Sequence, residues 1–476
     1  MKTALAVMLT ARAMPGHADT LADALATAYA TNPDLAAQRA LVRQFDEGVP
    51  QALSLGRPGV NVTVAGQQNG VDFSDNGRVA QAQLALTQSL YRGGRTRIAV
   101  NAAENRIYAA RARLRSTENN VLIAVVTAYS DVLRYAFLVE LNGNQVKVLE
   151  RELQASRDRF EVGDLTRTDV AQSDARLANA RTQYQVAQGQ LATARNAYVR
   201  VVGRAPEDLQ PVPPLPTLPG TAGQAVDLAN VNNPLLVAAR FDEAAARNDV
   251  QSIERERLPS VGASVGAQYQ QFNGGGGAGS FVRQGNFFTQ NVGIQATIPL
   301  YQAGLVASRV RQAQEARSQS LETIGSVGRQ VAETATNAFV NLQTSRAVIQ
   351  SSEVAVNANT LALEGVKQEN QVGTRTVLEV LNAEQELLQT RVNLVTARRD
   401  EYVAGYHLLA AVGQAEADAL ALPTATYDAT ANARLVRHKW NDFDVPKIPP
   451  ALPRPDRERA SSSVPIVPKP MLGPRR

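Results

Sequence analysis

Gly262-Ala-Ser264-Val-Gly266 is the stretch of this 476-residue chain that comes nearest to a catalytic motif. Its spacing is that of the GxSxG nucleophile elbow, in which a serine on a sharp strand-to-helix turn attacks a carbonyl carbon. Here the motif lies inside an alternating stretch that predicts a β-strand, and no helical pattern follows it. The one histidine between the N-terminal segment and the tail, His407, stands in a heptad pattern. A hydrolase is therefore the least favoured hypothesis.

A second glycine motif, Gly274-Gly-Gly276-Gly-Ala-Gly279, matches the dinucleotide fingerprint GxGxxG. It joins two predicted strands and opens no helix, so we expect an exposed hairpin loop. With three histidines and no cysteine, the chain has few ligands for a clustered metal site and cannot form a disulfide. The sequence thus predicts no enzyme activity, no metal site and no cofactor.

Charge and hydropathy exclude two further classes of protein. The formal net charge is +5 and the pI is about 9.4, but residues 424–476 hold ten Lys or Arg and five Asp or Glu. The body is therefore nearly neutral, which is a poor electrostatic footprint for nucleic acid. Mean hydropathy is −0.21, and no run of 18 apolar residues follows the N-terminus, which excludes a bundle of transmembrane helices.

The chain consists of two copies of one repeated unit. Asn32-Pro33 recurs 201 residues later as Asn233-Pro234, and Tyr91-Arg-Gly-Gly94 recurs 210 residues later as Tyr301-Gln-Ala-Gly304. Gly163 and Gly373 also lie 210 residues apart. We expect a signal peptide at 1–18, a first repeat at 19–203, a proline-rich linker at 204–221, a second repeat at 222–422 and a disordered, proline-rich basic tail at 423–476.

Each repeat is predicted to contain two strands and two long helices. Strict alternation of apolar and polar residues marks strand pairs at about 59–91 and about 260–301. A proline-free tract then predicts a long helix at 95–160, roughly 100 Å at 1.5 Å per residue, and a returning helix at 165–201. Heptads in the returning helices, with a small residue once in seven, indicate coiled-coil packing. The fold class is therefore mainly α with a β part.

The strand pairs indicate which class of protein the long helices belong to. They are apolar on one face, polar on the other, and long enough to cross a bilayer when tilted. Four strands cannot close a barrel, and open edges are not tolerated in hydrocarbon. Three copies would supply twelve strands and a hollow barrel. The alternative hypothesis is a periplasmic coiled-coil adaptor or scaffold, whose strands would form compact soluble domains.

The doubled pattern and the block "VGTRTVLEVLNAEQ", at residues 372–385, resemble the TolC family of outer-membrane efflux and type I secretion channels. The likeness covers about residues 20–422. It implies a homotrimer with a twelve-stranded barrel in the outer membrane of a Gram-negative bacterium and a helical tunnel in the periplasm. It also implies a periplasmic adaptor and an inner-membrane pump of the ABC, RND or MFS type as partners, with outer-membrane lipid and no nucleic acid.

The resemblance also assigns residues at the periplasmic tip. Gly163 and Gly373 would form the tip turns. Arg375 would reach Thr168 and Asp169 as a gate, and Glu379 would form an acidic entrance ring.

Two asparagines depart from the family pattern. Asn370 replaces an aromatic gate partner, and Asn382 replaces a second entrance acid. Helix capping alone is an alternative role for Thr168, Asp169 and Glu379, because hydroxyls and acids suit a helix N-terminus. Arg375 does not suit that position, and we expect an anionic partner for it.

Overall fold

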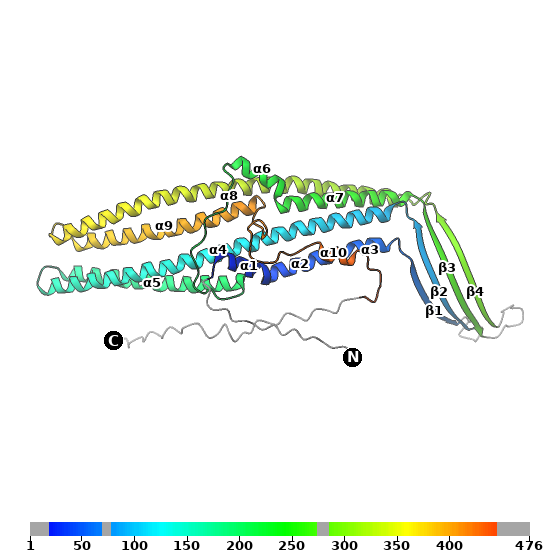
Figure 1. Ribbon diagram of the computed structural model, residues 1–476, viewed down its shortest axis with the longest axis horizontal. Coiled ribbons are helices and arrows are strands. Elements are labelled where there is room, and N and C mark those ends of the chain that lie inside the picture. The colour runs from blue at the N-terminus through cyan, green and yellow to red at the C-terminus, as the bar shows by residue number, and fades with distance from the viewer. Residues whose placement is uncertain (1–18, 69–77, 274–284, 445–476) are drawn as a thin grey trace. The chain divides into compact units, whose positions relative to one another are not determined.

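The structure is a computed structural model that describes residues 19–68, 78–273 and 285–444 (Figure 1). The predicted signal peptide at 1–18, the glycine motif at 274–279 and the tail from residue 445 lie outside these residues. Contacts group the chain into one unit from residue 1 to 438 and a second from 439 onward, and the fold described below belongs to the first.

Both repeats follow the same order: short helices, then two strands, then two long helices. The first is made of α1 (Leu21–Thr31), α2 (Pro33–Asp46), α3 (Gly48–Ser54), β1 (Gly59–Gln68), β2 (Arg78–Tyr91), α4 (Arg95–Glu161) and α5 (Arg167–Val202). The second is made of α6 (Ala222–Asn232), α7 (Pro234–Glu254), the 3-10 turn η1 (Arg255–Arg257), β3 (Ser260–Asn273), β4 (Gly285–Thr297), α8 (Leu305–Gln371) and α9 (Val377–Ala411). The predicted fold class, mainly α with two strands and long helices in each duplicated half, is confirmed.

The long helices form two antiparallel hairpins. α4 and α8 have 67 residues each, and α5 and α9 return along them (Figure 1). The heptad positions face the partner helix, since Leu177, Ala187 and Tyr198 of α5 are buried. α4 also contains an 18-residue window apolar enough to cross a membrane, but half of it is buried against other helices. It is the central core helix of the first repeat.

The repeated Asn-Pro dipeptides make the same joint in both copies. The side-chain oxygen of each asparagine accepts a hydrogen bond from the backbone N–H two residues ahead, at 2.9 Å and 3.0 Å, which caps α2 and α7. The amide of Asn32 donates to the carbonyl of Val201 at 3.2 Å, and that of Asn233 donates to Ala411 at 3.0 Å. Each asparagine therefore fixes the short helices of its repeat to the end of the returning helix.

The four strands form one antiparallel sheet in the order β1-β2-β3-β4. Residues paired across the strands share a face, and one face is mainly apolar, as in the row Val64, Ala82, Tyr269 and Phe288. The opposite face carries amides and hydroxyls, and Gln81 accepts hydrogen bonds from two glutamines of β3 at 3.2 Å and 3.3 Å. Within the described residues, β1 and β4 each have one unpaired edge.

The start of the predicted disordered tail is ordered, so that prediction is wrong for this part. α10 (Ala431–Val436) packs on α2 and buries Val436. Asn432 donates to the carboxylate of Asp46 at 2.9 Å, and that side chain has no exposed surface. Composition did not reveal this segment, because one short helix that covers a buried carboxylate leaves no periodic pattern.

Candidate functional site: the hairpin tips

Gly163 and Gly373 end the outgoing helices of the two hairpins in the same way. Their φ angles are 88° and 82°, in the left-handed region that glycine adopts without a steric penalty. Gly163 donates to the carbonyl of Phe160 at 3.0 Å, and the next residue donates to Arg159 at 2.9 Å. Gly373 makes the equivalent pair of bonds, both at 3.0 Å. This is the Schellman pattern, which satisfies the last carbonyls of a helix before the chain reverses.

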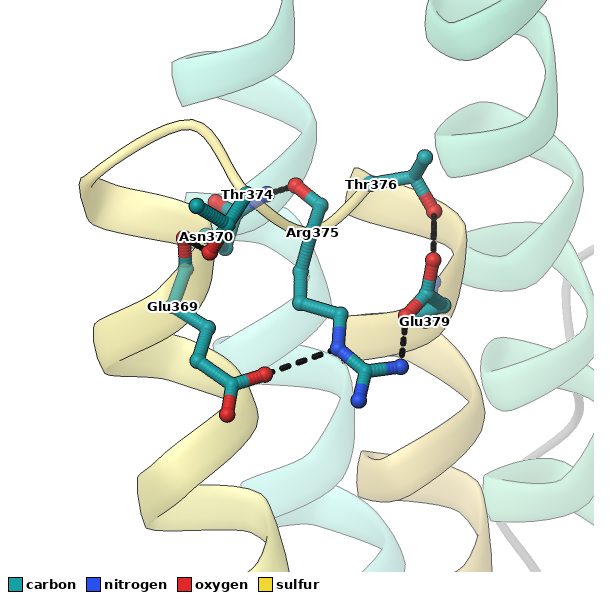
Figure 2. Close-up of polar contacts among 6 residues, drawn as sticks. All are labelled: Glu369, Asn370, Thr374, Arg375, Thr376 and Glu379. Carbon is teal, nitrogen blue, oxygen red and sulfur yellow. Dashed lines mark hydrogen bonds and ion pairs between the residues drawn. The ribbon is translucent and has the colours of Figure 1, made fainter.

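Arg375 bridges two glutamates of its own hairpin (Figure 2). Its Nε donates to Oε2 of Glu369 at 2.7 Å, and its Nη1 donates to Oε2 of Glu379 at 2.5 Å. Arg375 comes just before the N-cap of α9, where a cation is unfavourable unless an anion neutralises it. The two carboxylates therefore explain why an arginine is tolerated at this helix start.

Glu379 also belongs to the cap of α9. Its backbone N–H donates to Oγ1 of Thr376 at 3.3 Å, and the threonine hydroxyl donates to Oε1 of Glu379 at 3.0 Å. Hydrogen bonds from Arg375, then from Thr376, lower the pKa of the Glu379 carboxyl. The pKa of Arg375 is raised, chiefly by its hydrogen bond to Glu379. The predicted entrance acid is thus ionised and already holds a cation.

The start of α5 is capped without an arginine. Thr166 and Asp169 form a capping box, in which the Asp169 N–H donates to Thr166 Oγ1 at 3.3 Å and the Thr166 N–H donates back to Oδ2 at 3.0 Å. These bonds, led by that of the Thr166 side chain, lower the pKa of the Asp169 carboxyl. Thr168 is exposed and takes no part in the cap.

The structure brings some of the predicted gate residues together and leaves others apart. Asn370 donates from its amide to the carbonyl of Arg375 at 2.8 Å, so it belongs to the same turn as Arg375 and Glu379. Among the described residues of one protomer, no hydrogen bond or ion pair joins Arg375 to Thr168 or Asp169. The anionic partner expected for Arg375 includes Glu369, which the sequence interpretation missed. Its position in the last turn of α8, six residues before Arg375, was the available signal.

Two arginines of the first repeat reach across to the two asparagines of the second. Arg159 Nη1 donates to Oδ1 of Asn370 at 3.4 Å, and Arg176 Nη2 donates to Oδ1 of Asn382 at 2.7 Å. Both contacts join one hairpin to the other, above an apolar cluster that also spans both hairpins: Leu149, Leu153, Leu177, Val377 and Leu381. Asn370 and Asn382, which depart from the family pattern, therefore connect the two hairpins through hydrogen bonds. The sequence analysis did not predict the two arginines that donate these bonds.

The serine motif that resembled a catalytic site lies in the sheet. Ser264, the candidate nucleophile, is in the middle of β3, where it pairs with Thr87 on one side and Gly293 on the other. A residue held in a strand ladder on both sides is not on the exposed turn that a nucleophile elbow requires. Within residues 19–68, 78–273 and 285–444, no group of three or more His, Cys, Asp or Glu could hold a metal ion.

A duplicated helical hairpin that carries half of an amphipathic four-stranded sheet, with capped glycine turns at the tips, is the architecture of an outer-membrane channel protomer. The sequence model of the outer membrane efflux protein family matches residues 24–204 and 225–414, one segment in each repeat. The chain therefore belongs to the outer membrane efflux protein family, to which the TolC channels are related, and it is an outer-membrane protein with a large periplasmic part.

Similar proteins span most of the chain. The outer membrane efflux protein BepC of Brucella suis is 33% identical over 93% of this chain and 96% of its own length. The outer membrane protein TolC of Escherichia coli is 28% identical over 74% of this chain and 73% of its own length.

Solved structures share the fold. A structure of CusC superposes with a TM-score of 0.72 at 17% identity, and covers 83% of this chain and 92% of that chain. The outer membrane protein VceC of Vibrio cholerae gives a TM-score of 0.69 at 20% identity, with 83% of this chain and 96% of that chain covered. At these identities the likeness establishes the fold alone.

Proposed function

We propose that three copies of this chain join their sheets into one twelve-stranded barrel, which serves as the exit duct of a tripartite efflux pump or type I secretion system. The observation that carries the proposal is the four-stranded sheet with two open edges. A sheet edge presents unpaired N–H and C=O groups, and hydrocarbon offers nothing to satisfy them. Closure among copies removes every edge, and three sheets of four strands exceed the eight strands of the smallest barrels.

The two faces of the sheet fit this arrangement. Val62, Val292 and Ile294 are 69%, 82% and 75% exposed on the apolar face, an arrangement that water disfavours and lipid accepts. The opposite face is lined by neutral polar side chains: Thr63, Gln83, Ser264, Gln268, Asn291 and Gln295. Such a lumen hydrates a passing solute without selecting its charge.

The hairpin tips are proposed to form the periplasmic entrance. In a ring of three protomers, Arg375 would face Thr168 and Asp169 of a neighbouring coiled coil. Arg375 and Asp169 carry opposite charges, and Thr168 is exposed. Glu379 would supply the acidic ring, and Asn382 would leave it a single ring. Asn370 would hold the turn that presents Arg375.

The duct would perform no chemistry and would bind no cofactor. Its partners would be a periplasmic adaptor at the tips and an inner-membrane pump, which would supply the energy and select the cargo. Relatives differ in this respect: one is named alkaline protease secretion protein AprF of Pseudomonas aeruginosa, and another cobalt-zinc-cadmium resistance protein CzcC of Cupriavidus metallidurans. Co-purification of the adaptor and pump from native membranes would identify the system.

A fractionation experiment tests the duct itself. We expect the chain in the outer-membrane fraction, as a trimer whose electrophoretic migration changes on heating, and we expect stepwise conductance in planar bilayers. A periplasmic adaptor would instead appear as a soluble protein without conductance. A soluble monomer that produces no channels would overturn the proposed function.

A further inference from the structure

The polar face of the sheet changes character along the strands. Its cross-strand rows run from the end near α4 and α8 to the opposite end of the sheet (Figure 1). The first three rows hold small residues, hydroxyls and amides: Gly59, Thr87, Ser264 and Gly293; Asn61, Ala85, Gly266 and Asn291; Thr63, Gln83, Gln268 and Thr289. The last two rows hold Ala65, Gln81, Gln270 and Phe287, and then Gln67, Val79, Phe272 and Gly285. Within these rows, aromatic rings occur at the end away from the helices.

Phe272 and Phe287 come from neighbouring strands, and their rings are in contact. The ring centroids are 5.7 Å apart and the ring planes meet at 72°, which is an edge-to-face pair. Phe272 is the last residue but one of β3, and Phe287 is the third residue of β4. Both residues are half-buried, so part of the pair stays accessible on the polar side of the sheet. Accessible aromatic surface of this kind is where an aromatic molecule binds from water.

A third phenylalanine, Phe288, lies next to this pair on the other face. Successive side chains of a strand point to opposite faces. Phe288 pairs with Tyr269 on the apolar face and is 64% exposed. In the proposed duct Phe288 meets lipid, whereas Phe272 and Phe287 face the lumen. Contact with lipid therefore explains Phe288 but does not explain an aromatic pair on the water-filled side.

We infer that Phe272 and Phe287 form a binding site for uncharged, planar aromatic solutes at the outer end of the lumen. This inference rests on the proposed duct and adds a class of cargo to it. The long helices of that duct lie in the periplasm, so the end of the sheet away from α4 and α8 is its external mouth. Three copies would each contribute one pair of rings to the mouth.

The neighbouring side chains define the chemistry of the ligand. Aromatic rings associate in edge-to-face and offset-stacked arrangements, so the accessible part of the pair can receive a third ring. In the adjacent row, Gln81 accepts hydrogen bonds from Gln268 and Gln270 at 3.2 Å and 3.3 Å, and such amides both donate and accept. The five rows contain no charged residue. The site therefore fits a ring that carries uncharged polar groups.

Single-channel recordings in planar bilayers test the site. The probe is N-acetyltryptophanamide, an uncharged aromatic molecule with two amide groups, added on the external side of the full-length channel. We expect reversible binding to add current noise, which is reported as the concentration that gives half of the maximal noise. N-acetylleucinamide is the matched probe without a ring, and its half-maximal concentration should be several-fold higher. Passage requires binding that is weak enough for release.

Three variants locate the binding. Phe272→Ala and Phe287→Ala should each raise the half-maximal concentration of the aromatic probe by about two- to twelve-fold, the value of one aromatic contact. Phe288→Ala is the matched control, because it removes an adjacent ring from the other face of the same strand. Its half-maximal concentration should equal that of the unsubstituted protein.

Cysteine substitution tests the two faces without relying on a ligand, because the natural chain contains no cysteine. A charged, membrane-impermeant thiol reagent should reduce the conductance of Phe287→Cys, since the added group would stand in the lumen. The same reagent should leave the conductance of Phe288→Cys unchanged. The opposite pattern would overturn the assignment of the two rings to their faces, and with it the site.

The outcomes distinguish the site from the duct. Channels in which Phe272→Ala and Phe287→Ala leave the half-maximal concentration unchanged would overturn the aromatic site and leave the duct intact. Equal half-maximal concentrations for the two probes would overturn the preference for aromatic rings. An unsubstituted protein that produces no conductance would overturn the proposed function, and the site would fall with it.

Discussion

Arg375 donates a hydrogen bond from Nη1 to Oε2 of Glu379, 2.5 Å away, across the start of α9. Both side chains are partly exposed, at 49% and 38%, so water and salt weaken the pair. The guanidinium is held a second time by Glu369 at 2.7 Å. A neighbouring protomer that recruits Arg375 must therefore compete with carboxylates that this residue already binds. The proposed gate would therefore be an exchange of partners rather than the capture of a free cation.

Removing this cation should open the entrance. Arg375→Ala would release two carboxylates into the tip and would remove the proposed bond to Thr168 and Asp169, so we expect single-channel conductance in planar bilayers to rise several-fold. Arg375→Lys is the matched control, since it keeps the charge but cannot fork between two carboxylates. Its conductance should be intermediate. Unchanged conductance in Arg375→Ala would leave the arginine a purely structural role.

The acidic ring gives a second prediction. Glu379→Ala should weaken block of the channel by multivalent cations, because it removes one ionised carboxylate from each proposed copy at the entrance. Block is measured as the cation concentration that halves the current. Glu401→Ala, on the same helix about 33 Å further along at 1.5 Å per residue, should leave the block unchanged. Equal block in Glu379→Ala and the unsubstituted protein would remove Glu379 from the entrance.

The two hairpins of one protomer should separate more easily without their arginine–asparagine contacts. Arg176→Ala and Asn382→Ala should each increase the fraction of time that the channel spends in a state of higher conductance. A double-mutant cycle should give a coupling of about 0.5–1.5 kcal/mol, the net value of a typical hydrogen bond. Arg181→Ala is the control, because its partner Glu150 lies in the same hairpin at 2.8 Å. Additive effects in the cycle would show that Arg176 and Asn382 do not interact.

The duplication supplies a matched pair for a stability measurement. Lys367 and Glu384 form an ion pair between α8 and α9 in which the glutamate side chain is 7% exposed. Its counterpart, Arg157 with Asp174, is 54% and 65% exposed at 3.9 Å. Lys367→Ala should cost about 1–3 kcal/mol, because it leaves a nearly buried carboxylate without its hydrogen-bond donor.

The exposed counterpart should respond weakly. Arg157→Ala should cost about 0–1 kcal/mol, the range of surface pairs. Urea unfolding of the detergent-solubilised protein, followed by circular dichroism, would give both values from the shift in midpoint. Equal costs for the two substitutions would show that burial of Glu384 does not strengthen its pair.

Acid should loosen the tips before the rest of the helices. The pKa values of Asp169 and Glu379 are lowered by hydrogen bonds that exist only in the folded tips. A lowered pKa gives a stabilisation that is present above the unfolded values of about 3.9 and 4.3 and is lost as pH falls through the folded values. Amide exchange, corrected for intrinsic rates, should therefore accelerate in the first turns of α5 and α9 below roughly pH 4.

A variant checks that this effect comes from the named carboxylates. In Asp169→Asn the first turn of α5 should exchange at a rate that no longer depends on pH in this range, while α9 keeps its response. Identical pH profiles in the variant and the unsubstituted protein would assign the acid sensitivity to other groups.

Much of this protein is determined by short-range patterns that can be read along the chain. Alternation places β1 to β4, heptads place the buried side of α5 and α9, and the repeated Asn-Pro and glycine positions reveal the duplication. These features follow from local geometry, since a strand repeats every two residues, a helix every 3.6, and a left-handed turn needs glycine. The family resemblance drawn from them is confirmed, whereas the roles of the gate residues stay predictions.

Tertiary structure alone decided which long polar side chains meet. Arg375 was expected to need an anion, but its choice of Glu369 and Glu379 depends on how α8 and α9 are rotated about the turn. Arg159 and Arg176, which donate to Asn370 and Asn382, lie more than 200 residues earlier in the chain, in the other hairpin. Long flexible side chains can reach several neighbours, so only the packed positions of the helices select one.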